Sequence, residues 1–313
     1  MSSEVNANLR LSSEMFERIG QNTKEAEIIA RPSTTYWQDV WRRLKANKVA
    51  IGSLYFIGFL IIMAIVGPML TSYSYSDQSL QLKNLPPNGQ YWFGTDSLGR
   101  DLFTRVWFGA RMSLAIGIII SVVVFVIGVI YGGISGLAGG WVDEIMMRIV
   151  EILSGVPFVL YVILIMVILD ENNFFTILFA LSIVYWIPMA RLVRGQILSL
   201  KEQEYVLAAR TLGASPLRIL IKHLIPNVMG PILIYMTLAI PEAIFTEAWL
   251  SFLGLGVSAP FASWGTLASD GVKGLRSYPW QLFFPAIFIS LTILAFNLFG
   301  DGLRDALDPR TRK

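Results

Sequence analysis

Few side chains in this sequence could carry out chemistry. The 313 residues include no cysteine and a single histidine, His223, which excludes disulfides, thiolate catalysis and a histidine or cysteine metal cluster. The sequence has neither the Gly-Lys pair of a phosphate-cradling loop nor the G-x-S-x-G elbow of a serine hydrolase. A membrane-embedded enzyme would need a nucleophile, a base and a metal acting together, and the sequence offers no such combination. We therefore predict a chain with no catalytic centre and no cofactor of its own.

Two acidic residues lie inside a long apolar stretch. Glu242 and Glu247 are close to Pro231 and Pro241. Ionisable groups within a membrane are costly and are usually kept for function, so both glutamates are candidates for lining a translocation path. On a helix they lie about 140° apart, so they do not share one face. The structural alternative is that each is hydrogen-bonded to a neighbouring helix, with Glu247 near the outer water.

The composition indicates which elements position these residues. Hydrophobic residues make up 54% of the chain and charged residues 15%, which is more apolar than a water-soluble fold can bury. We therefore expect an all-α protein embedded in membrane lipid. The formal net charge of +3 argues against nucleic acid as a partner.

Six apolar stretches each approach the roughly 20 residues that a helix needs to cross a bilayer. The fourth is the shortest, and Pro188 could end it early. Placing both termini in the cytoplasm puts 19 of the 25 lysines and arginines on the inner side, as the positive-inside rule requires. We predict spans over residues 49–70, 112–137, 149–169, 174–189, 228–250 and 281–300.

The segment before the first span divides into two parts. Residues 1–34 are polar and mixed in charge and lack the apolar region of a secretory signal, which predicts a retained cytoplasmic tail. Residues 35–48 begin with a candidate capping box of Thr35 and Gln38. Apolar side chains then recur at helical spacing beside a basic cluster. Two tryptophans in this pattern favour an interfacial amphipathic helix over an ordinary surface helix.

Glycine recurs every fourth residue from the end of the second span, at Gly128, Gly132, Gly136 and Gly140. Such a stripe lets two helix backbones approach closely. We therefore expect helix packing here rather than a direct role in substrate passage.

The segment 191–227, between the fourth and fifth spans, is too long to be a simple connection. Apolar side chains recur at i, i+3, i+4 and i+7 from Tyr205 onward, which predicts a short amphipathic helix beginning near Glu204. Gly213 is well placed to end it in a left-handed cap. A second helix is predicted from Ser215, its N-cap, to a break at Ile225-Pro226. The apolar stripe of the first helix consists of Tyr205, Ala208, Ala209 and Leu212.

This stripe has two interpretations. The helix could lie in a groove of another protein, with Tyr205 and Leu212 as anchors and with Glu204 and Arg210 fixing the register. Alternatively, the helical hairpin could pack against the underside of its own bundle.

Residues 204–213, EYVLAARTLG, followed by Ile225-Pro226, resemble the EAA loop of ABC importer permeases. The match is good at the glutamate, alanine, glycine and proline positions, although tyrosine, valine and leucine separate the glutamate from the alanines. Three further motifs resemble the C-type permease subunit of oligopeptide and dipeptide importers: WFGTDSLGRD at 92–101, SFLGLG at 251–256 and GDGLRDALDPR at 300–310. The resemblance runs from about residue 37 to the end.

This resemblance implies a type I ABC importer permease domain of six helices over residues 49–313, in a bacterial cytoplasmic membrane. It implies a second homologous permease, two ATPase subunits that bind ATP and Mg, an extracellular peptide-binding lipoprotein and a peptide substrate. Oligopeptides are the expected substrate, and related C subunits also carry dipeptides, nickel or glutathione. The residues that would couple to the ATPases are Glu204, Tyr205, Ala208, Ala209, Arg210, Leu212, Gly213 and Pro226.

Two outer segments are candidates for contact with the binding protein or for an outer gate. In residues 93–101, Gly94 and Gly99 suggest turns and the aspartates suggest a helix cap, which favours a structural role. The glycine-rich loop 251–280 is the better candidate for a gate or a docking surface, although an aromatic belt explains part of it. The candidate residues are Asp96, Arg100, Asp101 and Trp264.

An autonomous ion-coupled carrier, with Glu242 and Glu247 as the ion site, is the alternative from a different class. Such carriers often contain an internal repeat, and none is detectable in this sequence. A carrier of this kind would also not explain the helical hairpin of residues 204–225.

Overall fold

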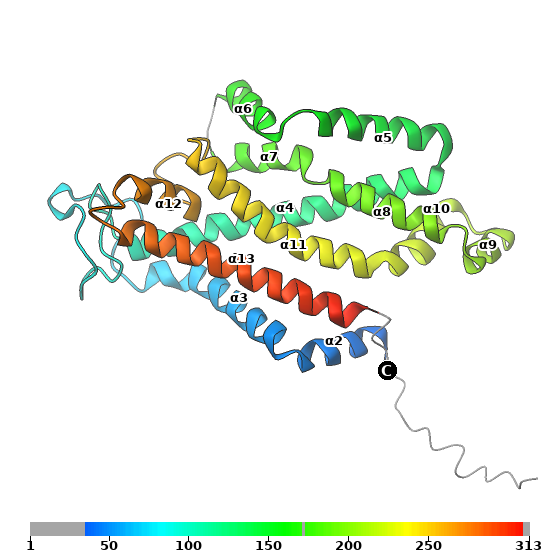
Figure 1. The fold of residues 1–313 in the computed structure, drawn as a ribbon, viewed down its shortest axis with the longest axis horizontal. Coiled ribbons are helices and arrows are strands. Elements are labelled where there is room, and N and C mark those ends of the chain that lie inside the picture. The colour runs from blue at the N-terminus through cyan, green and yellow to red at the C-terminus, as the bar shows by residue number, and fades with distance from the viewer. Residues whose placement is uncertain (1–34, 171–172, 309–313) are drawn as a thin grey trace, which may run out of the picture. The chain divides into compact units, whose positions relative to one another are not determined.

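The computed structural model describes residues 35–170 and 173–308. It divides into Met1–Asp39, of which only the start of one helix is described, and Val40–Lys313, which contains every other described helix. The described residues form helices and turns, with an isolated bridge between Thr95 and Asp101 and no strand (Figure 1). The expected all-α fold is confirmed. The tail predicted for residues 1–34 lies outside the described residues.

Five continuous helical segments are long and apolar enough to cross a membrane. A sixth span is present if α5 (Gly140–Gly155) and α6 (Phe158–Leu169), which are bent by 83° at their junction, are counted as one. The five are α3 with η2 (Lys48–Val66, Gly67–Met69), α4 (Leu102–Ala138), α7 with α8 (Phe174–Val184, Ile187–Leu200), α10 with η4 and α11 (Pro216–Ile219, Leu220–Leu224, Ile225–Phe252) and α13 (Trp280–Leu307). The shorter elements are α2 (Tyr36–Ala46), η3 (Leu80–Leu82), α9 (Glu204–Thr211) and α12 (Trp264–Lys273).

The third apolar stretch differs from the straight helix predicted over 149–169. Its first half already begins at Gly140, and the chain bends where Val156 is extended, at φ −91° and ψ 129°. The reason is Pro157, because the residue before a proline is pushed out of the helical region.

The second span begins ten residues earlier than the sequence predicted, at Leu102 instead of Met112. Two arginines in this added part donate to backbone carbonyls, so they do not end the helix. Arg105 donates to the Tyr75 oxygen at 2.9 Å, and Arg111 donates to the Ala64 and Ile65 oxygens at 2.5 and 2.8 Å.

Prolines interrupt the fourth and fifth spans less than the sequence predicted. Pro188 lies in the first turn of α8, where a missing N–H costs little, and the helix continues to Leu200. The predicted break at Ile225-Pro226 is absent, because η4 is a π-helical turn in which the Ile225 N–H reaches the Leu220 oxygen. This wider turn shifts the hydrogen-bond register just before the proline.

Two large apolar clusters hold the bundle together. One lies among α4, α6, α7, α8, η4 and α11, and the other joins α3, α4, α12 and α13. The predicted apolar stripe of α2 is only partly buried. Val40 and Leu44 pack against α3 and α13, while Trp41 remains exposed.

Candidate functional site

The short helix α9 forms where the sequence predicted it, and both of its caps follow from local residue types. Gly213 has φ +81°, and its N–H bonds to the Arg210 oxygen at 3.0 Å while the Ala214 N–H bonds to the Ala209 oxygen at 3.0 Å. These two bonds form a Schellman cap. The Ser215 side chain accepts from the Arg218 N–H at 3.4 Å and caps α10. The helix, glycine turn and second helix are therefore confirmed as local structure.

The apolar stripe of α9 faces away from its own bundle. Tyr205 and Leu212 are 41% and 88% exposed, and Ala208 is exposed beside them. Ala209 is half-buried, and the fully buried side chain is Val206, which joins the main apolar cluster. Val206 therefore holds the helix in place, and the stripe is available to another protein.

The other residues matched to the EAA loop are also on the surface. Glu204, Arg210, Gly213 and Pro226 are all exposed. A Cβ placed at Gly213 would meet no atom within 4 Å, so this glycine is needed for its backbone conformation and not for space.

The element that leads into α9 is packed firmly on the rest of the bundle. Three of the four predicted stripe glycines lie against α8: a Cβ at Gly128 would be 2.5 Å from Met189, one at Gly132 would be 2.3 Å from the Ala190 oxygen, and one at Gly136 would be 3.0 Å from the Arg194 oxygen. Gly140 departs from this pattern, because it begins α5 and has open space around it.

An ion pair ties α5 to α8 beside this stripe. The Arg194 guanidinium donates to both carboxylate oxygens of Asp143, at 2.5 and 2.6 Å. Lys201 at the end of α8 donates to the Gly136 oxygen at 3.2 Å. Sequence reasoning missed Val206 and this pair. Val206 lies between two exposed residues, so its position in the sequence does not indicate that it is buried. Asp143 and Arg194 are 51 residues apart, and they meet only because the turn after α4 brings α5 against α8.

The two glutamates of α11 occupy opposite environments. Glu247 is fully buried, and its Oε1 accepts from Ser251 at 2.9 Å and from Ser263 at 2.6 Å. This is the predicted structural alternative, except that Glu247 is not near water. In this structure the start of α12 covers its side chain, so Glu247 does not line an open path.

Glu242 is exposed on the other face of α11. Tyr235 and Thr246 lie within about 40° of it around the helix, which makes a polar stripe on an apolar span. The Tyr185 hydroxyl, from the turn between α7 and α8, donates to the Thr246 hydroxyl. The structure thus separates the two candidates and leaves Glu242 on an accessible polar face.

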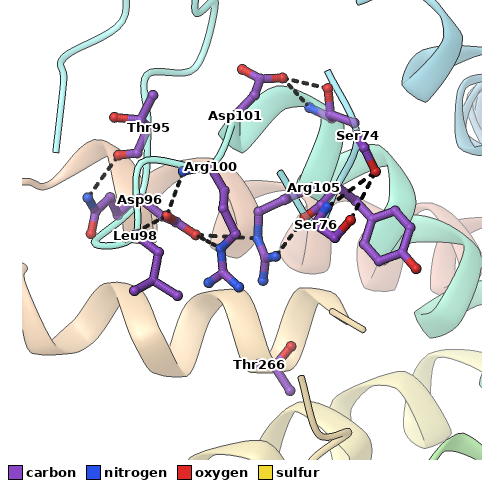
Figure 2. A network of polar contacts seen from close by, with 12 residues as sticks. Ser74, Ser76, Thr95, Asp96, Leu98, Arg100, Asp101, Arg105 and Thr266 are labelled. Carbon is purple, nitrogen blue, oxygen red and sulfur yellow. Dashed lines mark hydrogen bonds and ion pairs between the residues drawn. The ribbon is translucent and has the colours of Figure 1, made fainter. Parts of the chain in front are cut away.

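The outer candidates Asp96, Arg100 and Asp101 form a buried network rather than an exposed surface (Figure 2). The Asp96 carboxylate lies 2.6 Å from the Arg100 Nε and 3.5 Å from the Arg105 Nε. Asp101 caps α4 by accepting from the Thr104 N–H at 2.8 Å. Burial raises the pKa of Asp101, although the hydrogen bonds from Thr104 act in the opposite direction.

Trp264 is fully buried, so the expectation that it offers an outer docking surface is wrong for this structure. Its indole N–H donates to the Val106 oxygen at 2.9 Å, and its backbone N–H donates to the Ser113 hydroxyl at 3.1 Å. Trp264 begins α12, which Ser263 caps, and its ring anchors this helix on α4. Within residues 35–170 and 173–308, no group of three His, Asp or Glu side chains could hold a metal.

The described residues thus form a bundle of apolar helices that carries a short exposed helix on a firmly packed element. Residues 127–313 match the family of binding-protein-dependent transport system inner membrane components, and residues 35–87 match the N-terminal TM domain of oligopeptide transport permease C. The chain therefore belongs to this permease family. It is a multi-pass protein of the cytoplasmic membrane and a transport subunit, not an enzyme.

Several relatives cover nearly the whole chain. The oligopeptide transport system permease protein OppC of Bacillus subtilis (strain 168) is 56% identical, over 96% of this chain and 98% of the relative. The dipeptide transport system permease protein DppC of the same strain is 54% identical, over 96% and 94%. Among solved structures, a chain of the inward-facing MetNI methionine ABC transporter has a TM-score of 0.55 at 18% identity, over 65% of this chain and 96% of that chain. This last likeness shows a shared fold.

Proposed function

We propose that this chain is one of two permease subunits of an ATP-driven importer that takes up oligopeptides across a bacterial cytoplasmic membrane. The family and the names of its relatives support a peptide substrate. The observation that carries the proposal is the exposed apolar stripe of α9 on a chain with no nucleotide-binding loop. A permease that moves substrate uphill must then receive work from a separate subunit.

In this proposal α9 is the coupling helix. Tyr205 and Leu212 insert as anchors in a groove of an ATPase subunit, and the small Ala208 lets the two backbones approach. Glu204 and Arg210 flank the stripe and fix its register. Because Val206 and the cap at Gly213 hold α9 at a set angle, motion of the ATPase is transmitted to α8 and α11.

The complete importer contains two ATPase subunits, a second homologous permease and an extracellular peptide-binding lipoprotein. ATP and Mg bind on the ATPases and not on this chain. The basic residues around α9 and at both ends of the given sequence support a cytoplasmic position for these segments, by the positive-inside rule.

The polar stripe of Tyr235, Glu242 and Thr246 lines this chain's half of the peptide path. An exposed carboxylate on an apolar span is costly in lipid, so it faces either a water-filled path or the second permease. The buried network around Asp96 has a different role: it holds the outer loop against the bundle beneath the surface that the binding protein meets.

Proteoliposomes with the complete importer test the coupling role of α9. We expect Leu212→Asp to abolish peptide-stimulated ATP hydrolysis and uptake, because a buried charge at an anchor position would prevent the helix from seating. The matched control is Leu207→Asp, the same change at a 42% exposed leucine on the opposite side of α9. It should retain most of the activity. Equal loss in both variants would contradict an interface on the stripe.

The same vesicles distinguish an importer from an autonomous carrier. Uptake should require the ATPases and ATP, and uptake by this chain alone under an ion gradient would overturn the proposal. Dipeptides and longer peptides should be compared, because the relatives named for each are similarly identical to this chain.

A further inference from the structure

A groove runs along the seam between α3 and α13. Its volume is ≈ 330 Å³, and its walls are almost entirely apolar. The Ser53 hydroxyl in the wall donates to the Val49 oxygen at 2.9 Å, so it offers little polarity to an occupant. The charged group is Lys48 at the start of α3. The groove is lined by Lys48, Val49, Gly52, Ser53, Phe56, Leu291, Leu294, Ala295 and Leu298.

Lys48 marks the end of this groove at the turn between α2 and α3. Asn47 caps α3 and accepts from the Val49 and Ala50 N–H groups at 3.1 Å, which sets the turn between α2 and α3. A second cavity of ≈ 470 Å³ adjoins this turn and is lined by Arg42, Arg43, Ala46, Asn47, Gly302, Asp305 and Ala306. Lys45 lies over the exposed Trp41 ring, 5.2 Å from its centroid. Arg42, Arg43, Lys45 and Lys48 thus lie within seven residues of the sequence, and Asp305 is the acidic residue in the lining of the second cavity.

α3 and α13 touch at Gly302, which lines the second cavity. A Cβ at Gly302 would lie 2.3 Å from the Ala50 Cβ, so the two helices are in close contact there. Away from this contact the seam opens into the groove. An occupant of the groove therefore enters from the membrane side and ends at Lys48.

We propose that this seam binds one anionic phospholipid. An acyl chain fills the apolar groove, and the phosphate lies beside Lys48 at the end of the groove. The reason is that an apolar channel ending in a basic side chain at a membrane interface matches a lipid in both polarity and charge. A neutral lipid would match the groove but not Lys48. The proposal does not depend on which substrate the importer carries.

Gly52 provides a direct test of the groove. A Cβ at Gly52 meets no atom within 4 Å, so Gly52→Leu fills the groove without a clash and without loss of helix propensity. Gly58 also has open space but does not line the groove, so Gly58→Leu is the matched control. The purified importer is titrated with phosphatidylglycerol or phosphatidylcholine, and retained lipids are counted by native mass spectrometry.

We expect the wild-type importer and Gly58→Leu to retain one phosphatidylglycerol, at least tenfold more tightly than phosphatidylcholine. Gly52→Leu should weaken this binding about tenfold, and Lys48→Gln should remove most of the preference for the anionic lipid while leaving neutral lipid bound. Equal retention in wild type, Gly52→Leu and Gly58→Leu would overturn the proposal. Loss of the second permease from Gly52→Leu complexes, with lipid binding unchanged, would also overturn it, because the groove would then be a protein interface.

Discussion

At the scale of single residues, Glu242 and Glu247 show that two identical side chains on one helix can have opposite environments. The buried glutamate accepts from Ser251 of the same helix at 2.9 Å, and it connects α11 to the N-cap of α12 by accepting from Ser263 at 2.6 Å. The exposed one lies on a stripe with two half-buried polar residues, Tyr235 and Thr246. The first is a structural residue, and the second is the candidate for the transport path.

Replacing each glutamate with alanine should separate these roles. Glu247→Ala removes the acceptor of two buried hydroxyls and leaves a cavity, so it should lower the free energy of unfolding by about 2–4 kcal/mol. Glu242→Ala should leave stability within about 0.5 kcal/mol of wild type, because its side chain is exposed. Chemical unfolding in mixed micelles measures both variants. Equal destabilisation would show that Glu242 is structural as well.

At the scale of elements, the contact between α4 and α8 determines how α9 is held. The glycine stripe brings the α4 backbone against Met189 and Ala190, and the Asp143–Arg194 pair secures α5 on the same helix. A helix that must transmit force to the spans needs such a stiff connection, because a loosely packed one would absorb the movement.

Gly132 and Gly133 are neighbours on α4 that should respond oppositely to alanine. A Cβ at Gly132 would lie 2.3 Å from a backbone oxygen of α8, which cannot move without displacing the helix. Gly132→Ala should therefore destabilise the protein by about 1–3 kcal/mol and weaken coupled ATP hydrolysis. A Cβ at Gly133 would make an ordinary contact at 3.5 Å with Leu220.

The control, Gly133→Ala, should be neutral or slightly stabilising, because alanine favours a helix interior over glycine. Thermal denaturation and ATPase assays on the two variants give the comparison. A similar loss in both would mean that the stripe is not a close backbone contact.

At the scale of the whole molecule, α11 separates the two ends of the transport subunit. Its 28 residues extend for about 42 Å, with α9 and α10 before it and α12 after it. In Figure 1, α9 and α12 lie at opposite ends of this helix. If α11 spans the membrane, these two short helices lie on opposite sides of it.

The absence of native cysteine makes the orientation directly testable. Leu212→Cys at the end of α9 and Lys273→Cys at the end of α12 introduce single thiols at exposed positions. In intact cells, a membrane-impermeant maleimide should label Lys273→Cys and should reach Leu212→Cys only after the membrane is opened. The reverse pattern would invert the proposed topology and place α9 away from any cytoplasmic ATPase.

Much of the local structure could be predicted from the sequence. The apolar stretches, the caps at Gly213 and Ser215, and the glycine spacing each depend on residues within one or two helical turns, so the pattern alone indicates them. The helix boundaries were less accurate, because the residues that extend α4 and join η4 to α11 are satisfied by hydrogen bonds that sequence periodicity does not record.

The sequence by itself determined that this chain is a membrane protein with a short amphipathic helix before its fifth apolar stretch, because composition and local periodicity decide burial in lipid and helix formation. Its resemblance to importer permeases rested on four separate motifs. Only the tertiary structure decided which side of each helix is covered. It buried Glu247, Asp96 and Trp264 and left Glu242 and the α9 stripe exposed. The physical reason is that burial depends on neighbours from distant parts of the chain: α12 covers Glu247, while Val206 turns the stripe of α9 away from its own bundle.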